Sequence, residues 1–115
     1  MKLAVVGGRT FNDYNRLAII LESLRDSFGF TTIVSGGAVG ADSLGAQFAD
    51  DHHMNKIIHL PNWSLHGKAA GFIRNRDIIN DADMVVACWD GESRGTSNSI
   101  ALAKEQKKDT LILYY

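Results

Sequence analysis

Short apolar runs alternate with longer segments of helical character along this chain, and this alternation restricts the folds open to it. Residues 3–6, 31–34, 56–60, 84–89 and 110–114 are apolar nearly throughout. Parallel strands that helices cover on both faces have this composition. Strands that alternate with helices form β–α–β units around a parallel sheet. The pattern therefore predicts an α/β fold with a five-stranded parallel sheet.

Four segments between these runs are expected to be helices: 13–28, 41–52, about 68–80, and 95–107. The first has the clearest helical stripe, with Leu17, Leu21 and Leu24 on one face and Asn12 or Asp13 as the N-cap. Because β–α–β crossovers are almost always right-handed, we expect a three-layer Rossmann-like domain with strand order 3-2-1-4-5. Ligands bind such sheets at the switch point between the first and fourth strands.

The composition indicates one ordinary domain spanning residues 1–115, with 45% hydrophobic and 22% charged residues. The net charge of -1 provides no general attraction for a nucleic-acid backbone or an anionic membrane, so we expect neither as a partner. No apolar run reaches the length of a signal-peptide core or a membrane span, which predicts a cytoplasmic protein. Exposed edge strands and apolar helix faces are compatible with a homo-oligomer.

Glycines and small polar residues gather after three of the predicted strands, in residues 7–11, 35–42 and 90–96. Glycine lets backbone N–H groups approach an anion closely, and a following helix start adds free donors. Neither the G-x-G-x-x-G fingerprint nor a Walker lysine is present. The three loops share one edge of the sheet, which predicts a pocket for a nucleotide or a nucleotide-derived phosphate.

Several side chains near these loops suit such a ligand. Arg9 and Arg74 can bind phosphate, whereas Arg76 fits an ordinary surface arginine. Asp42 either accepts a ribose hydroxyl or braces its loop, and Trp63 either stacks on a base or packs at the rim. We expect no metal site, because the histidines lack metal-ligand spacing. The expected ligand contacts are Gly7, Gly8, Arg9, Thr10, Ser35, Gly36, Gly37, Gly40, Asp42, Trp63, Gly71, Arg74, Asn75, Asp90, Ser93, Arg94, Gly95 and Thr96.

Taken in order, these motifs resemble the YspA-like branch of the SLOG superfamily. They are Gly7-Gly8-Arg9-Thr10-Phe11, Ser35-Gly36-Gly37-Ala38-Val39-Gly40-Ala41-Asp42, the stretch from Trp63 through Gly71 to Arg74-Asn75, and Asp90-Gly91-Glu92-Ser93-Arg94-Gly95-Thr96. The resemblance covers essentially the whole chain. It implies a Rossmannoid fold with a nucleotide-derived ligand at this edge. The superfamily includes the Lonely Guy phosphoribohydrolases and the fold of DNA-processing protein A.

The phosphoribohydrolases use an Arg-Lys pair and a Gly-Thr-x-x-Glu motif. Here Asn75 replaces the lysine and Ser99 stands in the place of the glutamate. A serine cannot supply the carboxylate that N-glycosidic cleavage requires. We therefore expect a binding domain that acts as a sensor, a sequestering protein or a signalling domain. A nucleotide hydrolase with Asp42, Asp90 or Glu92 as its acid is the alternative, and single-stranded DNA binding is a second alternative that needs a basic track.

Overall fold

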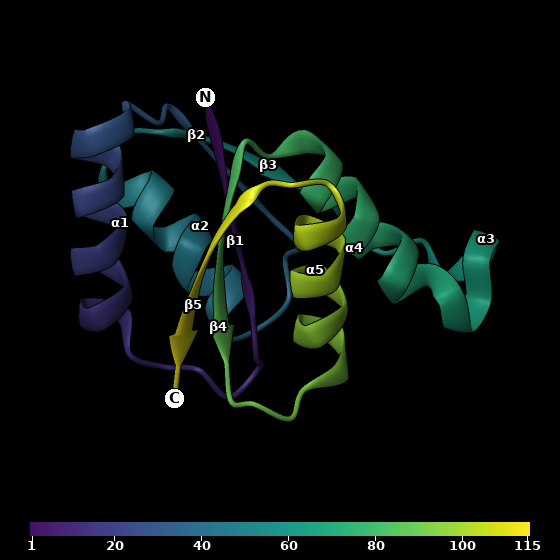
Figure 1. Ribbon diagram of the computed structural model, residues 1–115. Coiled ribbons are helices and arrows are strands. Elements are labelled where there is room, and N and C mark those ends of the chain that lie inside the picture. The colour runs from purple at the N-terminus through teal and green to yellow at the C-terminus, as the bar shows by residue number, and fades with distance from the viewer.

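The computed structural model covers residues 1–115 and is a single parallel sheet between two layers of helices (Figure 1). Its strands lie in the order β3-β2-β1-β4-β5, and every neighbouring pair is parallel. The predicted fold class and strand order are confirmed. In chain order the elements are β1 (Lys2–Gly7), α1 (Tyr14–Phe28), β2 (Thr32–Ser35), α2 (Ala41–Asp51), β3 (Asn55–Ile58), α3 (Trp63–His66), a 3-10 turn (Gly67–Ala69), α4 (Ala70–Asp81), β4 (Met84–Trp89), α5 (Arg94–Glu105) and β5 (Asp109–Tyr114).

The central strand β1 is buried on both faces, which explains its unbroken apolar run. Leu3 and Val5 belong to the core on the α1 and α2 side, while Ala4 and Val6 belong to the core on the α4 and α5 side. Successive side chains of a strand point to opposite faces, so each layer receives alternate residues of the same strand. Figure 1 shows the two helix pairs on opposite sides of the sheet.

The segment between β3 and α4 is more complex than the sequence pattern predicts. It contains the short helix α3 and a 3-10 turn before α4 begins at Ala70. The Asn62 side chain caps α3 by accepting the Leu65 N–H at 3.1 Å, and Gly67 ends it with a φ of 55°. A residue at that φ cannot continue a right-handed helix. The four longer helices are the four predicted ones, and α3 lies at the outer end of the molecule, beyond α4 (Figure 1).

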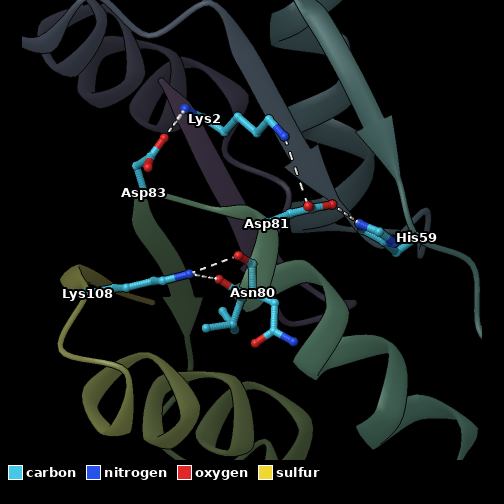
Figure 2. Close-up of polar contacts among 7 residues, drawn as sticks. Lys2, His59, Asn80, Asp81, Asp83 and Lys108 are labelled. Carbon is cyan, nitrogen blue, oxygen red and sulfur yellow. Dashed lines mark hydrogen bonds and ion pairs between the residues drawn. The ribbon is translucent and has the colours of Figure 1, made fainter.

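Polar contacts fix the end of α4 that lies far from the sheet's carboxyl edge (Figure 2). The Lys108 ammonium donates to the main-chain oxygens of Ile79 and Asn80 in the last turn of α4, where the Ile79 oxygen also accepts the Ala82 N–H. Asp81 forms ion pairs with His59 at 2.5 Å and with Lys2 at 4.0 Å. These contacts hold α4 against the strands on either side and thereby fix where its first turns point. None of the helices combines the length and apolar character needed to cross a membrane.

Candidate functional site

A cavity of about 480 Å³ opens at the carboxyl ends of β1 and β4, where the chain leaves the sheet toward opposite helix layers. This volume lies within the range of small-molecule sites, and its position is the switch point of the sheet. The cavity is lined by Val6, Gly7, Gly8, Arg9, Thr10, Ala38, Asp42, Trp63, Lys68, Gly71, Phe72, Arg74, Asn75, Ile78, Asp90, Ser93, Gly95, Thr96 and Tyr115.

Most of the contact residues expected from sequence line this cavity, but a group of them does not. The lining omits Ser35, Gly36, Gly37, Gly40 and Arg94, and it also omits Glu92 among the candidate acids. Three of the omitted residues, Gly36, Gly37 and Gly40, belong to the loop after β2, and Ser35 is the last residue of that strand. The glycines of that loop therefore have a role other than lining the cavity.

The loop after β2 folds around the carboxylate of Asp42. Asp42 Oδ2 accepts the Ala38 N–H at 3.3 Å, and the Gly36 backbone makes a further hydrogen bond to the same carboxylate. Gly40 adopts a φ of 84° and packs so closely that an added Cβ would lie 2.3 Å from the Gly8 oxygen. The glycines thus allow the loop to close on its own helix, so that Ala38 of the loop and Asp42 of the helix line the cavity.

Asp42 is only 6% exposed, and this burial raises its pKa from 3.8 to about 6. Removing a carboxylate from water penalises its charged form. The backbone hydrogen bond from Ala38 and the positive charges of Arg74 and Arg9 act in the opposite direction. Asp42 is therefore a carboxyl group that changes its charge near neutral pH and faces the cavity.

Arg74 projects from α4 and is held by contacts on two sides. Its Nη1 donates to the Gly36 oxygen at 2.7 Å, and its Nε donates to Asn75 Oδ1 at 3.2 Å. Asn75 Nδ2 in turn reaches the Gly95 oxygen at 3.4 Å. These bonds join α4, the β2 loop and the start of α5. They leave the Nη2 group of the Arg74 guanidinium without a protein acceptor, available for an anion in the cavity.

The N-terminus of α5 supplies backbone donors to the same cavity. Ser93 caps the helix by accepting the Thr96 N–H at 3.5 Å, and Asp90 Oδ1 accepts the N–H groups of Glu92 and Ser93 at 2.9 and 2.8 Å. These backbone bonds lower the pKa of Asp90. The N–H groups of Arg94 and Gly95 have no acceptor in the protein. Free first-turn donors at the positive end of a helix dipole are suited to a phosphate.

Aromatic side chains lie at both ends of the cavity. Trp63 and Phe72 are 57% and 51% exposed on the α3 and α4 side. At the other end Tyr115 Oη lies 2.9 Å from Thr10 Oγ1. No group of three or more His, Cys, Asp or Glu side chains is gathered here or elsewhere in a way that could hold a metal ion.

Six lining residues lie outside the set expected from sequence: Val6, Ala38, Lys68, Phe72, Ile78 and Tyr115. Lys68 and Phe72 fall inside the glycine-containing stretch before Arg74, so their position in the chain could have indicated them. Tyr115 is different, because its contact with Thr10 joins residues 105 positions apart. Only the fold brings the end of β5 to the loop after β1.

A Rossmann-like parallel sheet with a glycine-lined cavity at its switch point is the arrangement in which open α/β domains bind ligands. Residues 1–66 match the YspA, cpYpsA-related SLOG family, and the chain belongs to this family. The chain is also similar to the Gene 61 protein of Mycobacterium phage D29. The two are 29% identical over 112 residues, which cover 90% of this chain and 89% of that protein.

Solved structures with the same fold include DNA processing protein A from Helicobacter pylori, with a TM-score of 0.77 and 23% identity over 100% of this chain. The same protein from Streptococcus pneumoniae has a TM-score of 0.77 and 20% identity over 96% of this chain. This chain spans 66% and 49% of those two proteins, respectively. TM1055 has a TM-score of 0.68 and 20% identity, covering 95% of this chain and 71% of its own.

These neighbours correct one expectation from sequence. The net charge of -1 argues against nucleic acid as a partner, but the Helicobacter pylori protein with this fold has a single-stranded DNA binding mode. The exclusion is therefore wrong. The reasoning failed because net charge averages over the whole surface, whereas nucleic acid is bound by the local charges of a groove.

Proposed function

We propose that this protein binds a nucleotide or a nucleotide-derived phosphate ligand in the cavity at the carboxyl edge of β1 and β4, as a sensing, sequestering or signalling domain. The observation that carries the proposal is the juxtaposition of free backbone donors and a guanidinium. The N–H groups of Arg94 and Gly95 lack acceptors, and Gly95 lines the cavity together with Arg74. A phosphate between them would accept charge-assisted hydrogen bonds from both.

The remaining lining groups suit the sugar and the base. Asp42 can accept a ribose hydroxyl at the floor of the cavity, and Trp63 offers an exposed ring at its rim. Base stacking on an aromatic side chain contributes about 1–3 kcal/mol per base. Gly71 lies beside Trp63, since an added Cβ would be 3.8 Å from the Cη2 atom of its ring.

Isothermal titration calorimetry with nucleoside monophosphates, ADP-ribose, NAD and cyclic nucleotides tests the proposal. We expect at least one to bind, and Arg74→Gln to weaken that binding ten-fold or more because it removes the cationic donor. Arg76→Gln is the matched control, since Arg76 lies on the same helix but outside this cavity. Absence of binding to every compound in a folded sample contradicts the proposal.

Single-stranded DNA binding is a second candidate, favoured by two observations. Trp63 and Phe72 are exposed beside Lys68 at the open rim, and proteins of this fold include one with a single-stranded DNA binding mode. Aromatic rings beside cations are the usual features of such sites. Fluorescence polarisation with a labelled oligo(dT) tests this candidate. Retention that weakens steeply with salt and is lost in Trp63→Ala supports it, and no polarisation change at low salt contradicts it.

Hydrolysis of the bound nucleotide remains the alternative to simple binding, and burial raises the pKa of Asp42 to about 6, which suits proton transfer near neutral pH. Ser99 is buried at 2% exposure and lies outside the cavity lining, so it does not replace the missing glutamate. Chromatography of an incubated nucleotide decides between the two. Release of base or phosphate that Asp42→Asn abolishes supports the enzyme, and unchanged nucleotide supports binding alone.

A further inference from the structure

Several backbone donors of the two glycine loops are already used inside the protein. In the loop after β1, the Gly8 N–H donates to the Cys88 oxygen at 3.0 Å, and the Phe11 N–H donates to the Gly8 oxygen at 3.3 Å. In the loop after β2, Gly36 and Ala38 bond to the Asp42 carboxylate. The other N–H groups of the β2 loop, those of Gly37, Val39 and Gly40, lie outside the cavity lining, so the free donors of these two loops that line the cavity are Arg9 and Thr10 of the β1 loop.

The ring of Tyr115 also covers the β1 loop directly. A Cβ added to Gly8 would lie 1.8 Å from Tyr115 Oη, so the phenol occupies the space above this glycine. The ring is held in place by Phe11, edge to face with centroids 5.1 Å apart, and by the hydrogen bond to Thr10. In dinucleotide-binding Rossmann folds, a glycine here lets the pyrophosphate approach the backbone. In this chain Tyr115 stands in that path.

Outside the β1 loop that Tyr115 covers, the start of α5 offers an anion position. The free N–H groups of Arg94 and Gly95 lie there, with Gly95 in the same cavity wall as Arg74. The charges that line the cavity also favour a single phosphate. Arg9, Lys68 and Arg74 are cationic, and Asp42 and Asp90 are carboxylates that would repel a second phosphate.

We propose that the cavity takes a ligand with a single phosphate group, a nucleoside monophosphate type, and that Tyr115 excludes pyrophosphate-linked ligands by closing the path across the β1 loop. This inference rests on the proposed function and narrows its ligand class. Tyr115 is then a specificity-determining residue. It needs glycine at position 8, because any side chain there would displace the phenol.

Titration with the pairs AMP and ADP, and GMP and GDP, tests the inference. In the wild-type protein we expect the monophosphate of at least one pair to bind ten-fold or more tightly than its diphosphate. Tyr115→Ala should reduce that preference to less than three-fold, by opening the path. Tyr115→Phe keeps the ring and should keep the preference. Tyr114→Ala is the matched control, because the Tyr114 ring packs on Trp89 instead.

The possible failures separate this inference from the proposed function. Equal or tighter binding of the diphosphates by the wild-type protein overturns the single-phosphate inference and leaves nucleotide binding standing. A preference that persists in folded Tyr115→Ala overturns the role of Tyr115. No binding of any of the four nucleotides by the folded wild-type protein counts against the inference and the proposed function together.

Discussion

The carboxylate of Asp42 accepts the backbone N–H of Ala38 at 3.3 Å, from within the first turn of the helix that follows their shared loop. The loop that most resembles an anion cradle in the sequence thus binds an anion that belongs to the protein itself. The carboxylate is buried, and its environment sets the pKa of the group. The consequences can be measured as a pH dependence of stability.

Replacing Asp42 by Asn should change that pH dependence. The pKa of Asp42 is about 6 in the folded protein and 3.8 as the ordinary value, so between these pH values the folded state holds a proton that the unfolded chain releases. The stability that comes from holding this proton is present below about pH 4 and is lost as pH rises toward 6. Relative to wild type, Asp42→Asn should gain up to about 3 kcal/mol in unfolding free energy between pH 4 and pH 7.

Urea unfolding at several pH values measures this difference. Asp26→Asn, on the exposed side of α1, is the control and should show no comparable trend. A stability difference between Asp42→Asn and wild type that stays constant from pH 4 to pH 7 would mean that Asp42 is not destabilised by its burial.

Gly45 lets α2 pack closely on the central strand. A Cβ at this position would lie 2.7 Å from Val5 Cβ, which is fixed in the core. Gly45→Ala should therefore cost about 1–3 kcal/mol of stability, although alanine favours helices. Gly95→Ala in α5 meets no atom within 4 Å and should be neutral or gain up to about 1 kcal/mol. Thermal unfolding of both variants checks this, and equal effects would contradict the packing argument.

Lys108 stabilises the C-terminus of α4 through the main-chain oxygens of Ile79 and Asn80. Lys108→Gln should lower the unfolding free energy by about 1 kcal/mol, because it removes a charged donor from the carbonyls of the last helical turn. Lys107→Gln is the neighbouring control, since the Lys107 side chain is exposed. Chemical denaturation distinguishes the two. If both variants lose the same stability, the contact in Figure 2 contributes nothing specific.

Trp63 should report occupancy of the cavity. Its ring is exposed at the rim, whereas Trp89 is partly buried and donates from Nε1 to the Ser93 oxygen at 3.1 Å. Nucleotide binding should therefore change the intrinsic fluorescence, and Trp63→Phe should remove most of the change. Trp89→Phe should keep it. A signal that survives intact in Trp63→Phe places the base away from this ring.

The sequence predicts the fold well because the central strands β1, β2 and β4 are buried, and their apolar composition indicates it. The run at β4 and the stripe of Leu17 and Leu21 on α1 are local signals that tertiary packing only reinforces. The short helix α3 is not predicted, because four residues are too few to show a helical period. Among the site residues, Arg74 follows from its place beside the glycines, whereas Tyr115 depends on a contact between distant parts of the chain.

The glycine loops show where sequence reasoning reaches its limit. Composition predicts that the backbone of a glycine-rich loop can contact an anion, but it does not predict which anion that is. In the β2 loop the acceptor is Asp42, and in the β1 loop the Gly8 N–H bonds to Cys88 of the neighbouring strand. At the start of α5, the Arg94 and Gly95 N–H groups stay free. The hydrogen bonds that each loop makes in the folded protein decide its role.

Backbone amide shifts on adding AMP test the central claim most directly, because they report each N–H group separately. In a ¹⁵N-labelled sample, we predict that the resonances of Arg94 and Gly95 move with increasing AMP while Gly36 and Ala38 move much less. That pattern places the phosphate at the start of α5. A folded protein in which Arg94 and Gly95 do not shift, or in which Gly36 and Ala38 shift most, contradicts the account.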